Sequence, residues 1–508
     1  MASTYCLAMD IGAESGRAML AQIDEERIAA DGYIRLSEVH RFANAAVRLP
    51  DGLHWDVLRI WTEVKNSLAQ AIRQCGASLA SVGIDTWGVD FGLLDRTGAL
   101  IGNPYHYRDS RTDGMLEEAF RRMPRAQVYE RTGLLPLQFV TLYQLLSMVT
   151  SRSPVLDIAE TFLTTPDLLN YWLTGRKGCE FTIASTTQCY NPHLESWDRV
   201  LLERMGIPAR LFPAVIQPGT ELGPLLPYVA EEVGLGHDGL TVVAPACHDT
   251  ASAAAAVPAE RPGCAWISSG TWSVVGTELH EPIINDTTLA YRLASEGGVC
   301  GTFFLCLNVM GLWIVQECRR IWAGQGEALS YAELTEQAEH ARPFQAVIDP
   351  DDAEFFKPGD MPARIQSYCQ HTSQAVPESK GAIVRCVLES LALKYRWALE
   401  RLEEVVRQRL DPLHIVGGGT QNRLLNQLTA DATGRLVLTG PVEATALGNV
   451  LMQALALGRI GSLQEGRELI RRSFPLERYE PRTEAQREWN EAYERMSSLM
   501  YPSALIAA

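Results

Sequence analysis

The chain has 508 residues, which is too long for a single ordinary hydrophobic core, so we expect two large domains. Hydrophobic residues make up 46% of the chain and charged residues 21%, the balance of a folded globular protein rather than a disordered one. The formal net charge of −16 argues against a nucleic-acid partner or an anionic membrane surface, because both are bound by basic patches. An anionic ligand would therefore be held by backbone N–H groups, helix N-termini or a metal ion.

Signals for export, membrane insertion and zinc binding are missing from the sequence. Asp10 interrupts the only apolar run near the N-terminus and no basic segment precedes it, so we expect no signal peptide. No apolar stretch approaches the length of a membrane span. Eleven cysteines occur without a CxxC pair or the Cys/His spacing of a zinc site. These features predict a cytoplasmic protein with reduced, buried thiols.

The first half of the chain begins with strands. Residues 5–23 read as two strands joined by a short Gly-containing turn, which predicts a β-hairpin, and residues 33–43 read as a further strand. Residues 79–95 return to strand character after a helix predicted over residues 55–76. The helix is predicted from an apolar stripe spaced i, i+3, i+4, i+7 and i+11, formed by Val57, Ile60, Trp61, Val64 and Leu68. Strands followed by a helix and another strand indicate a layered α/β domain.

The second half repeats this organisation. Residues 239–256 predict a buried strand, a short turn and an Ala-rich helix, and residues 263–279 predict a second hairpin. A long amphipathic helix is predicted around an apolar stripe from Val384 to Leu402. It is followed by a strand, a triple-glycine turn, a helix from about Asn422 and a small-residue helix that stops at Gly458. Residues 349–363, which contain two phenylalanines, read as a long ordered loop.

Two tight turns of small residues, Gly12–Gly16 and Ser268–Thr271, occupy corresponding positions in the two halves. The chain has neither a G-x-x-x-x-G-K-[ST] loop nor a G-x-G-x-x-G fingerprint, so the two commonest nucleotide cradles are absent. A hairpin turn can bind phosphate when its successive N–H groups point inward. Either turn alone is typical of an ordinary hairpin. The pair favours a polyphosphate that is held from both sides.

Two aspartates follow predicted strands. Asp10 ends a strand just before the first turn, where it could make an Asx-turn bond or hold a hydrated Mg²⁺ against the phosphates, and we favour the second role. Asp249 lies between a strand and a helix, and that stretch alone favours a helix N-cap. The alternative role is a general base, because open α/β sheets place their ligands at the carboxyl ends of strands. The neighbouring His248 could bind a substrate hydroxyl or satisfy a turn.

The triple glycine, Gly417 to Gly419, lies between an apolar strand and a helix. One glycine could serve a turn, whereas three in a row indicate backbone that approaches something flat or charged. We interpret this turn as the binding site of an adenosine moiety.

Eight segments together resemble the FGGY carbohydrate kinases, and they occur in this order: "AMDIGAESGR", "GIDTWGVDF", "YRDSRTDG", "CHDTASA", "SSGTWS", "NVMGLWIVQ", "HIVGGGTQN" and "PVEATALGN". The resemblance runs from about Tyr5 to Gly458. It implies an α/β protein with two actin-like, RNase H-type domains and a catalytic cleft between them. Within the family, the segments are most similar to the members that use ATP to phosphorylate L-rhamnulose at its C1 hydroxyl in L-rhamnose degradation.

The resemblance also implies a role for each half. Residues 1–247 would carry the sugar side and the first phosphate hairpin, and residues 248–508 the catalytic base, the second hairpin and the adenosine site. Asp249 matches the general base, and Mg²⁺ would be held through water by Asp10. The residues that match ATP contacts are Ala13, Glu14, Ser15, Gly16, Arg17, Thr271, Gln316 and Gly418. The residues that match sugar contacts are Gly88, His248, Asp249, Thr250 and Asn308.

Two alternatives stay open at the level of sequence. A kinase for another ketose, such as xylulose or fuculose, would share these motifs. A non-kinase actin-like ATPase would share the phosphate turns but would need neither a sugar nor a base. The presence of Asp249, His248 and Asn308 favours a kinase with a small-molecule sugar substrate, and the sequence predicts no particular oligomeric state.

Overall fold

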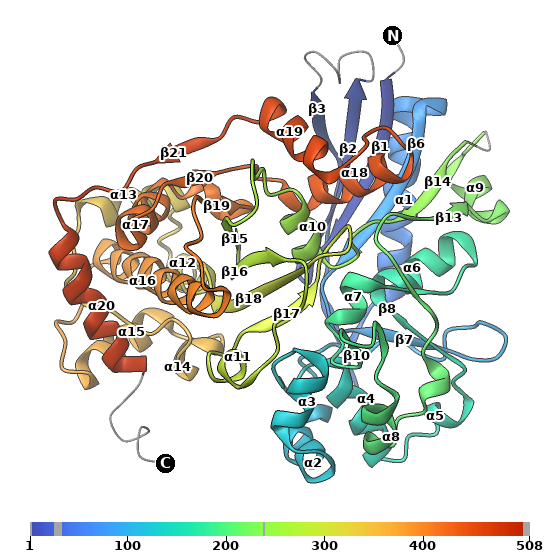
Figure 1. The fold of residues 1–508 in the computed structure, drawn as a ribbon, viewed down its shortest axis with the longest axis horizontal. Helices are drawn as coiled ribbons and strands as arrows, with labels where there is room; N and C mark the ends of the chain where they lie inside the picture. Colours follow the sequence, from blue (N-terminus) through green and yellow to red (C-terminus); the bar gives the residue numbers. More distant parts are fainter. Residues whose placement is uncertain (1–2, 25–32, 237–238, 501–508) are drawn as a thin grey trace. The chain divides into compact units, whose positions relative to one another are not determined.

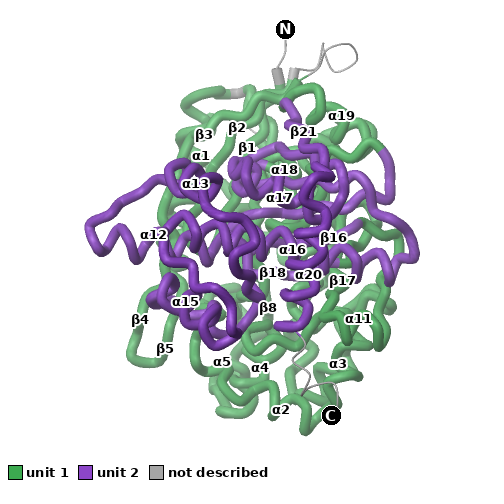
Figure 2. The backbone as a smooth tube through the Cα atoms, turned by 90° about the vertical axis from the view of Figure 1, so that its left-hand side faces the viewer, with its two compact units in different colours: residues 1–260, 278–305, 444–474 green, residues 261–277, 306–443, 475–508 purple. Residues whose placement is uncertain are grey.

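The computed structural model describes residues 3–24, 33–236 and 239–500 of the chain (Figure 1). The packing of the backbone divides them into two compact units (Figure 2). Unit 1 consists of residues 1–260, 278–305 and 444–474, and unit 2 of residues 261–277, 306–443 and 475–508. Each unit thus draws on separate stretches of the sequence. The expected division into residues 1–247 and 248–508 assigns roles to the halves and stays a prediction.

Unit 1 is built on a six-stranded sheet with the strand order β13-β14-β6-β1-β2-β3. β1 runs antiparallel to β2 and parallel to β6, which in turn runs parallel to β14. The hairpin predicted over residues 5–23 is therefore confirmed. The strands of this sheet are β1 (Ser3–Ile11), β2 (Ser15–Asp24), β3 (Ile34–Ala43), β6 (Leu79–Thr86), β13 (Thr220–Pro224) and β14 (Thr241–Ala244).

Helix α1 (Val57–Cys75) confirms the helix predicted from the apolar stripe. It begins after Asp56, whose side chain accepts a hydrogen bond from the backbone N–H of Arg59, and it ends at Gly76, which has a positive φ of 54°. Its buried face packs into one hydrophobic core with the sheet. That core includes Leu7, Met9, Ile11, Ile60, Val64, Leu68, Val82 and Ile84.

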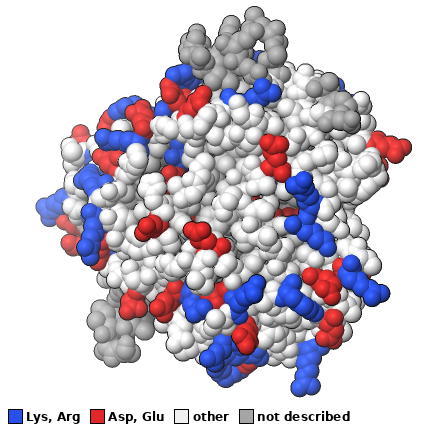
Figure 3. Space-filling model, turned by 45° about the vertical axis from the view of Figure 1, so that its right-hand side comes forward, with Lys and Arg blue, Asp and Glu red and all other residues white. Residues whose placement is uncertain are grey.

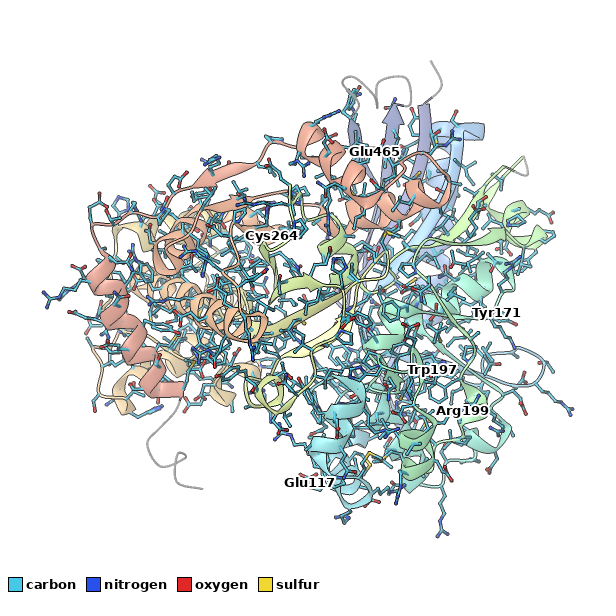
Figure 4. The ribbon with its side chains drawn as sticks, in the orientation of Figure 1. Glu117, Tyr171, Trp197, Arg199, Cys264 and Glu465 are labelled. Atoms are coloured by element: carbon cyan, nitrogen blue, oxygen red, sulfur yellow. The ribbon has the colours of Figure 1, made fainter. Side chains whose placement is uncertain are left out.

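The remaining helices of unit 1 surround this sheet and a second core (Figure 1). Trp197, labelled in Figure 4, lies in the second core 4.8 Å from the ring of Phe212, and its indole N–H donates to the Pro213 carbonyl. The helices are α2 (Met115–Arg122), α3 (Arg125–Thr132), α4 (Thr141–Thr150), α5 (Val155–Ile158), α6 (Thr165–Thr174), α7 (Phe181–Ser185), α8 (Arg199–Met205), α9 (Pro227–Val233), α10 (Asp249–Ala255), α11 (Asp286–Ala290), α18 (Ala444–Ala456) and α19 (Leu463–Ser473).

Short strands complete unit 1. They pair as β4 (Ala46–Leu49) with β5 (Gly52–Trp55), β7 (Phe91–Leu94) with β8 (Thr161–Thr164), β9 (Cys179–Glu180) with β12 (Val215–Ile216), and β10 (Tyr190–Asn191) with β11 (Ser196–Trp197). β17 (Ala294–Gly297) also belongs to this unit.

Unit 2 repeats the arrangement of unit 1 at its own hairpin. β15 (Ala265–Ser269) runs antiparallel to β16 (Trp272–Leu279) and parallel to β19 (Leu413–Val416), just as β1 pairs with β2 and β6. From β18 (Phe303–Met310) onward the strand order is β18-β16-β15-β19-β20-β21, with β20 at Val437–Thr439 and β21 at Glu477–Tyr479. The prediction that each half opens with a hairpin of one design is therefore confirmed.

Four helices were predicted in the second half. The long amphipathic helix and the helix from about Asn422 form in unit 2 as α16 and α17, whereas the Ala-rich helix and the small-residue helix form in unit 1 as α10 and α18. One expectation is wrong: residues 349–363 are not a continuous loop, because α14 forms within them, α15 begins at Met361, and the side chain of Asp352 caps α14. The helices of unit 2 are α12 (Trp313–Gly324), α13 (Tyr331–His340), α14 (Ala353–Phe356), α15 (Met361–His371), α16 (Lys380–Val406), α17 (Arg423–Thr433) and α20 (Gln486–Met500). In the described part of the chain, no helix is both long enough and apolar enough to cross a membrane.

Candidate active site

Three aspartates lie at the carboxyl ends of neighbouring parallel strands in unit 1. Asp10 is next to the last residue of β1, and its partner in the register of β6 is Asp85. Asp249 follows β14, and its neighbour His248 forms a parallel bridge with Thr86 at the end of β6. The strand order β14-β6-β1 therefore gathers these three carboxylates at one edge of the sheet, the edge at which α/β proteins bind ligands.

Asp10 is a buried carboxylate with one ion-pair partner. The guanidinium Nη2 of Arg17, across the hairpin, lies 2.9 Å from its Oδ2. Burial is the main reason why the pKa of Asp10 is raised to about 6. The positive charge of Arg17 lowers this pKa, and the negative charge of Asp249 raises it. The site thus concentrates negative charge that one arginine does not neutralise.

Asp85 is fully buried. Its Oδ2 accepts a hydrogen bond of 2.6 Å from the side-chain amide of Asn449 in α18, whereas its Oδ1 has no hydrogen-bond partner. Burial, followed by repulsion from Asp10, raises the pKa of Asp85 well above its ordinary value.

Asp249 is the first residue of α10, and the N-cap is His248. The interpretation of Asp249 as the N-cap is therefore wrong, because the preceding residue takes that position. Its Oδ1 accepts a hydrogen bond of 2.6 Å from the N–H of the next residue, Thr250, and its side chain keeps 33% of its exposure. Burial raises the pKa of Asp249 to about 6. This carboxylate is accessible, and its pKa lies close to neutral pH, which suits a general base.

Glu180 holds the turn that carries His248 and Asp249. It is fully buried at the start of α7 and accepts hydrogen bonds from the N–H of Cys247 and the hydroxyl of Thr182, at 3.0 and 2.6 Å. That hydroxyl oxygen in turn accepts from the N–H of His248 at 3.1 Å. Burial raises the pKa of Glu180 to about 7. No local sequence signal pointed to this glutamate, because its role depends on a contact 67 residues away.

Gly88 lies in a tight turn after β6. A Cβ on it would come within 3.0 Å of the Thr186 hydroxyl, and the next residue, Val89, has a positive φ of 71°. The turn is fixed by Asp90, which accepts hydrogen bonds from the indole N–H groups of Trp55 and Trp87 at 2.6 and 2.9 Å. Asp90 is thus a structural carboxylate whose oxygens are already engaged.

The turn between β1 and β2, together with the first residues of β2, contains five of the predicted ATP contacts. Gly12 donates its N–H to the Ser15 carbonyl at 2.9 Å. The side-chain amide of Asn44 donates to the Gly12 carbonyl. Gly16 is required by packing, because a Cβ there would overlap the ring of Phe42 at 2.1 Å. The side chains of Glu14 and Ser15 are exposed at the tip.

The second hairpin turn lies in unit 2, where it accepts hydrogen bonds from residues at the start of α12. The carbonyls of Gly270 and Thr271 accept from the N–H groups of Leu312 and Trp313, at 3.0 and 3.1 Å. Gly311 permits this approach, because a Cβ there would lie 2.8 Å from the Gly270 carbonyl oxygen. Gln316 follows in the first turn of α12, so two predicted ATP contacts, Thr271 and Gln316, lie on adjoining segments.

The triple-glycine turn follows β19 and packs on the end of β15. Gly417 has a φ of 87°, and a Cβ on Gly419 would overlap the hydroxyl of Ser269 at 2.0 Å. Gly418 differs from both, because its φ is not positive and nothing lies within 4 Å of a Cβ built on it. Backbone conformation and packing thus require glycine at positions 417 and 419, whereas neither requires it at position 418. Asn308 lies separately on β18, with an exposed side chain.

The structure therefore brings the predicted residues together in two sets. Unit 1 contains Asp10, the turn of Ala13, Glu14, Ser15, Gly16 and Arg17, and the group of Gly88, His248, Asp249 and Thr250. Unit 2 contains Thr271, Gln316, Gly418 and Asn308. Glu180 and Asn449, whose side chains hold Cys247 and Asp85, were not predicted as site residues from the sequence.

The residues around Asp10 fit a hydrated divalent cation. Within the described residues, no three His, Cys, Asp or Glu side chains are placed to hold a metal ion directly. Buried carboxylate oxygens nevertheless gather here, and one of them, Oδ1 of Asp85, has no hydrogen-bond partner. Mg²⁺ keeps several waters and is bound through one or two carboxylates plus substrate phosphates, so this donor set suits it.

Known proteins share sequence with this chain along nearly its whole length. The model of the FGGY family of carbohydrate kinases, N-terminal domain, matches residues 5–256, and that of the C-terminal domain matches residues 265–457. The chain is 42% identical over 486 residues to the rhamnulokinase of Bacteroides thetaiotaomicron, covering 96% of this chain and 97% of that protein. It is 38% identical over 473 residues to the rhamnulokinase of Oceanobacillus iheyensis, covering 93% and 97%.

Solved structures share the fold at low sequence identity. A ligand-bound xylulose kinase from Lactobacillus acidophilus superposes with a TM-score of 0.83 at 16% identity, covering 99% of both chains. A gluconate kinase from the same organism gives a TM-score of 0.82 at 16% identity, covering 100% of this chain and 99% of that one. The predicted two-domain α/β fold is therefore confirmed.

Proposed function

The chain belongs to the FGGY family of carbohydrate kinases, and we propose that it transfers the γ-phosphoryl group of ATP to the C1 hydroxyl of L-rhamnulose, giving L-rhamnulose 1-phosphate. The observation that carries the choice of sugar is the identity of 38–42% to rhamnulokinases along nearly the whole chain. The solved xylulose and gluconate kinases, at 16% identity, support the fold and not a substrate.

Asp249 is the proposed general base. It accepts the proton of the C1 hydroxyl while that oxygen bonds to the γ-phosphorus and the bond to the ADP oxygen breaks. Its raised pKa of about 6 leaves the carboxylate ionised at neutral pH yet basic enough to take the proton. The proton then passes to solvent as the product leaves.

The remaining roles follow the two sets of residues. We assign the sugar to Gly88, His248, Asp249 and Thr250 in unit 1 and to Asn308 in unit 2. The nucleotide is assigned to the turn of Ala13, Glu14, Ser15, Gly16 and Arg17 in unit 1, and to Thr271, Gln316 and Gly418 in unit 2. Phosphoryl transfer needs positioning and charge neutralisation more than covalent help, and turns rich in backbone N–H groups provide both. Asp10 would hold Mg²⁺ through water, and that ion would neutralise phosphate charge.

A panel of sugars in an assay of ADP release tests the proposal. L-Rhamnulose should give the highest kcat/KM, ahead of L-fuculose, D-xylulose and glycerol, and ADP release without sugar should be slow. The Asp249→Asn variant, purified in the same way, controls for a contaminating kinase. A higher kcat/KM for xylulose or glycerol would overturn the choice of sugar. Rapid ATP turnover without any sugar would instead indicate a non-kinase ATPase.

A further inference from the structure

The imidazole of His248 lies between two carboxylates in unit 1. Its Nε2 is 3.5 Å from Oδ1 of Asp249. Its Nδ1, a buried atom that has no hydrogen-bond partner among the described residues, is 3.4 Å from Oε2 of Glu296 on β17. The side chains of His248 and Glu296 keep only 12% and 10% of their exposure. Glu296 belongs to none of the motifs that carry the family resemblance, so its position needs an explanation of its own.

Helix α7 fixes the backbone on both sides of this contact. At its start, the Thr182 hydroxyl holds the N–H of His248. At its end, the Ser185 hydroxyl accepts the N–H of Gly297, the residue after Glu296, at 2.9 Å. One short helix therefore sets the distance between the histidine and the glutamate. Their approach is a built feature of the fold rather than a chance contact between loops.

One ring nitrogen of His248 must carry a proton, and the other must carry a lone pair. Burial lowers the pKa of His248, so the ring is neutral at pH 7, and a neutral imidazole carries its proton on only one nitrogen. Both neighbours are carboxylates, which only accept hydrogen bonds, so just one of them can receive that proton.

Glu296 is the better acceptor of the two. The side chain of Glu296 keeps 10% of its exposure, whereas that of Asp249 keeps 33%. A donor stabilises a buried carboxylate more than one that water also reaches. The proton therefore belongs on Nδ1, facing Glu296, and the lone pair on Nε2, beside Asp249.

We propose that Glu296 is a positioning residue that fixes His248 in the Nδ1–H tautomer, so that Nε2 accepts a hydrogen bond from a sugar hydroxyl. The imidazole and the carboxylate of Asp249 then form a pair of neighbouring acceptors, with Nε2 3.5 Å from Oδ1 of Asp249. Such a pair selects a substrate with two hydroxyl donors close together, one that is phosphorylated and one that is only bound. The identity of that ligand as a sugar rests on the proposed function, whereas the tautomer does not.

NMR of the ligand-free protein with ¹⁵N-labelled histidine measures the tautomer directly. We expect the parent to show His248 as Nδ1–H, assigned by the signal that disappears in His248→Gln. Glu296→Leu removes the acceptor and should shift the ring toward Nε2–H. Glu296→Gln keeps an acceptor oxygen and should keep the Nδ1–H form. Ser295→Ala is the matched control, because this neighbour on β17 bonds to the Ile283 carbonyl and not to the histidine.

Kinetics give the second readout. Glu296→Leu should raise the KM for the sugar by roughly tenfold, the scale of one misaligned hydrogen bond, with the KM for ATP unchanged. Glu296→Gln should recover most of that loss, and Ser295→Ala should show none.

Two results would overturn the inference: an Nε2–H ring in the parent, or an unchanged tautomer in Glu296→Leu. If Glu296→Leu does not fold, the parent spectrum and Glu296→Gln still decide. Should L-rhamnulose prove not to be the substrate while His248 is Nδ1–H, the proposed function fails and the role of Glu296 stands.

Discussion

The three aspartates at one sheet edge differ in what their oxygens already bind. Asp10 is paired with Arg17, and Asp85 is held by Asn449, whereas Asp249 accepts from its neighbour Thr250 through Oδ1 and keeps 33% of its side-chain exposure. A base must have a free acceptor within reach of the substrate. The structure therefore separates, residue by residue, carboxylates that looked equivalent in the sequence, and it favours Asp249 for proton transfer.

Replacing Asp249 with Asn should lower sugar-dependent turnover by roughly 10²–10⁴, the usual loss when a general base is removed. The amide oxygen can still accept the N–H of Thr250, so the free energy of unfolding should change by no more than about 1 kcal/mol. ADP release and urea unfolding measure the two effects.

Asp56→Asn is the matched control for that variant, because it makes the same change at the start of α1 and should leave turnover unchanged. Near-normal turnover in a folded Asp249→Asn protein would refute the assignment. Asp85 would then be the next candidate, ahead of Asp90, because both oxygens of Asp90 already accept hydrogen bonds.

The raised pKa of Asp249 also predicts the pH profile. The base works only when ionised, so kcat/KM for the sugar should rise with pH up to about 6 and level off above it. A base with an ordinary aspartate pKa would place this limb near pH 4. Steady-state rates over this range measure the limb, which should disappear from the residual activity of Asp249→Asn. A limb that persists in the variant would belong to another carboxylate of the site, such as Asp10, whose pKa is also raised to about 6.

Gly418 offers a test of the nucleotide site alone. Because nothing lies within 4 Å of a Cβ at this position, Gly418→Val should leave the melting temperature unchanged. Its side chain would instead enter the space assigned to ATP, so ATP should bind at least tenfold more weakly while sugar binding stays normal. Calorimetry with each ligand separately measures this. Gly419→Ala is the contrasting variant and should lose stability, because its methyl group meets the Ser269 hydroxyl. Unchanged ATP affinity would remove the turn from the site.

At the scale of elements, α18 holds the carboxylate site in place. Asn449 binds Asp85, and Gln453 donates to the Leu7 carbonyl of β1 and accepts from Ser81 of β6. The same helix packs closely on α10, which begins with Asp249. Small residues on α18 make this approach possible, so the small-residue motif that marks the helix in the sequence has a packing role.

Gly448→Ala tests that contact between helices. Its Cβ would lie 1.7 Å from the carbonyl oxygen of Ser252 in α10, so one of the two helices must move. We expect a loss of about 1–3 kcal/mol of unfolding free energy, and lower turnover because Asp249 moves with α10. Gly324→Ala, at the open end of α12, is the control and should be neutral or slightly stabilising. Equal stability for the parent and Gly448→Ala would contradict this account of the packing.

Elements and motifs were predictable from the sequence because their signals are local. The apolar stripe of α1, the two hairpins and the turn residues around Asp10 and Gly418 all show within about 20 residues. The side chains that hold the site residues in place were not predictable, because they lie far from those residues in the sequence. Asn449 reaches Asp85 across 364 residues, and β17 brings Glu296 to His248. The loop expected over residues 349–363 failed for a local reason, the capping of α14 by Asp352.

At the scale of the whole molecule, the charge is strongly negative although the substrate ATP is an anion. The net charge of −16 would repel a nucleotide at long range. Figure 3 shows acidic and basic side chains interspersed over one face, without a broad basic field. Arg17, which follows the first proposed phosphate turn, is itself paired with Asp10. Under the proposed function, binding would therefore rely on short-range contacts, namely backbone N–H groups at the two proposed phosphate turns and the proposed Mg²⁺.

The dependence of the KM for ATP on salt tests this conclusion. Salt screens the long-range repulsion but hardly weakens short hydrogen bonds, so between about 0.05 and 0.5 M KCl the KM should stay level or fall by about twofold. The KM for the uncharged sugar, measured in the same series, is the internal control and should not change. Binding through a basic surface would give the opposite sign, because counterions would then compete with the phosphates. A tenfold rise in the KM for ATP across this range would show that cationic side chains, rather than the two glycine-rich turns, hold the nucleotide.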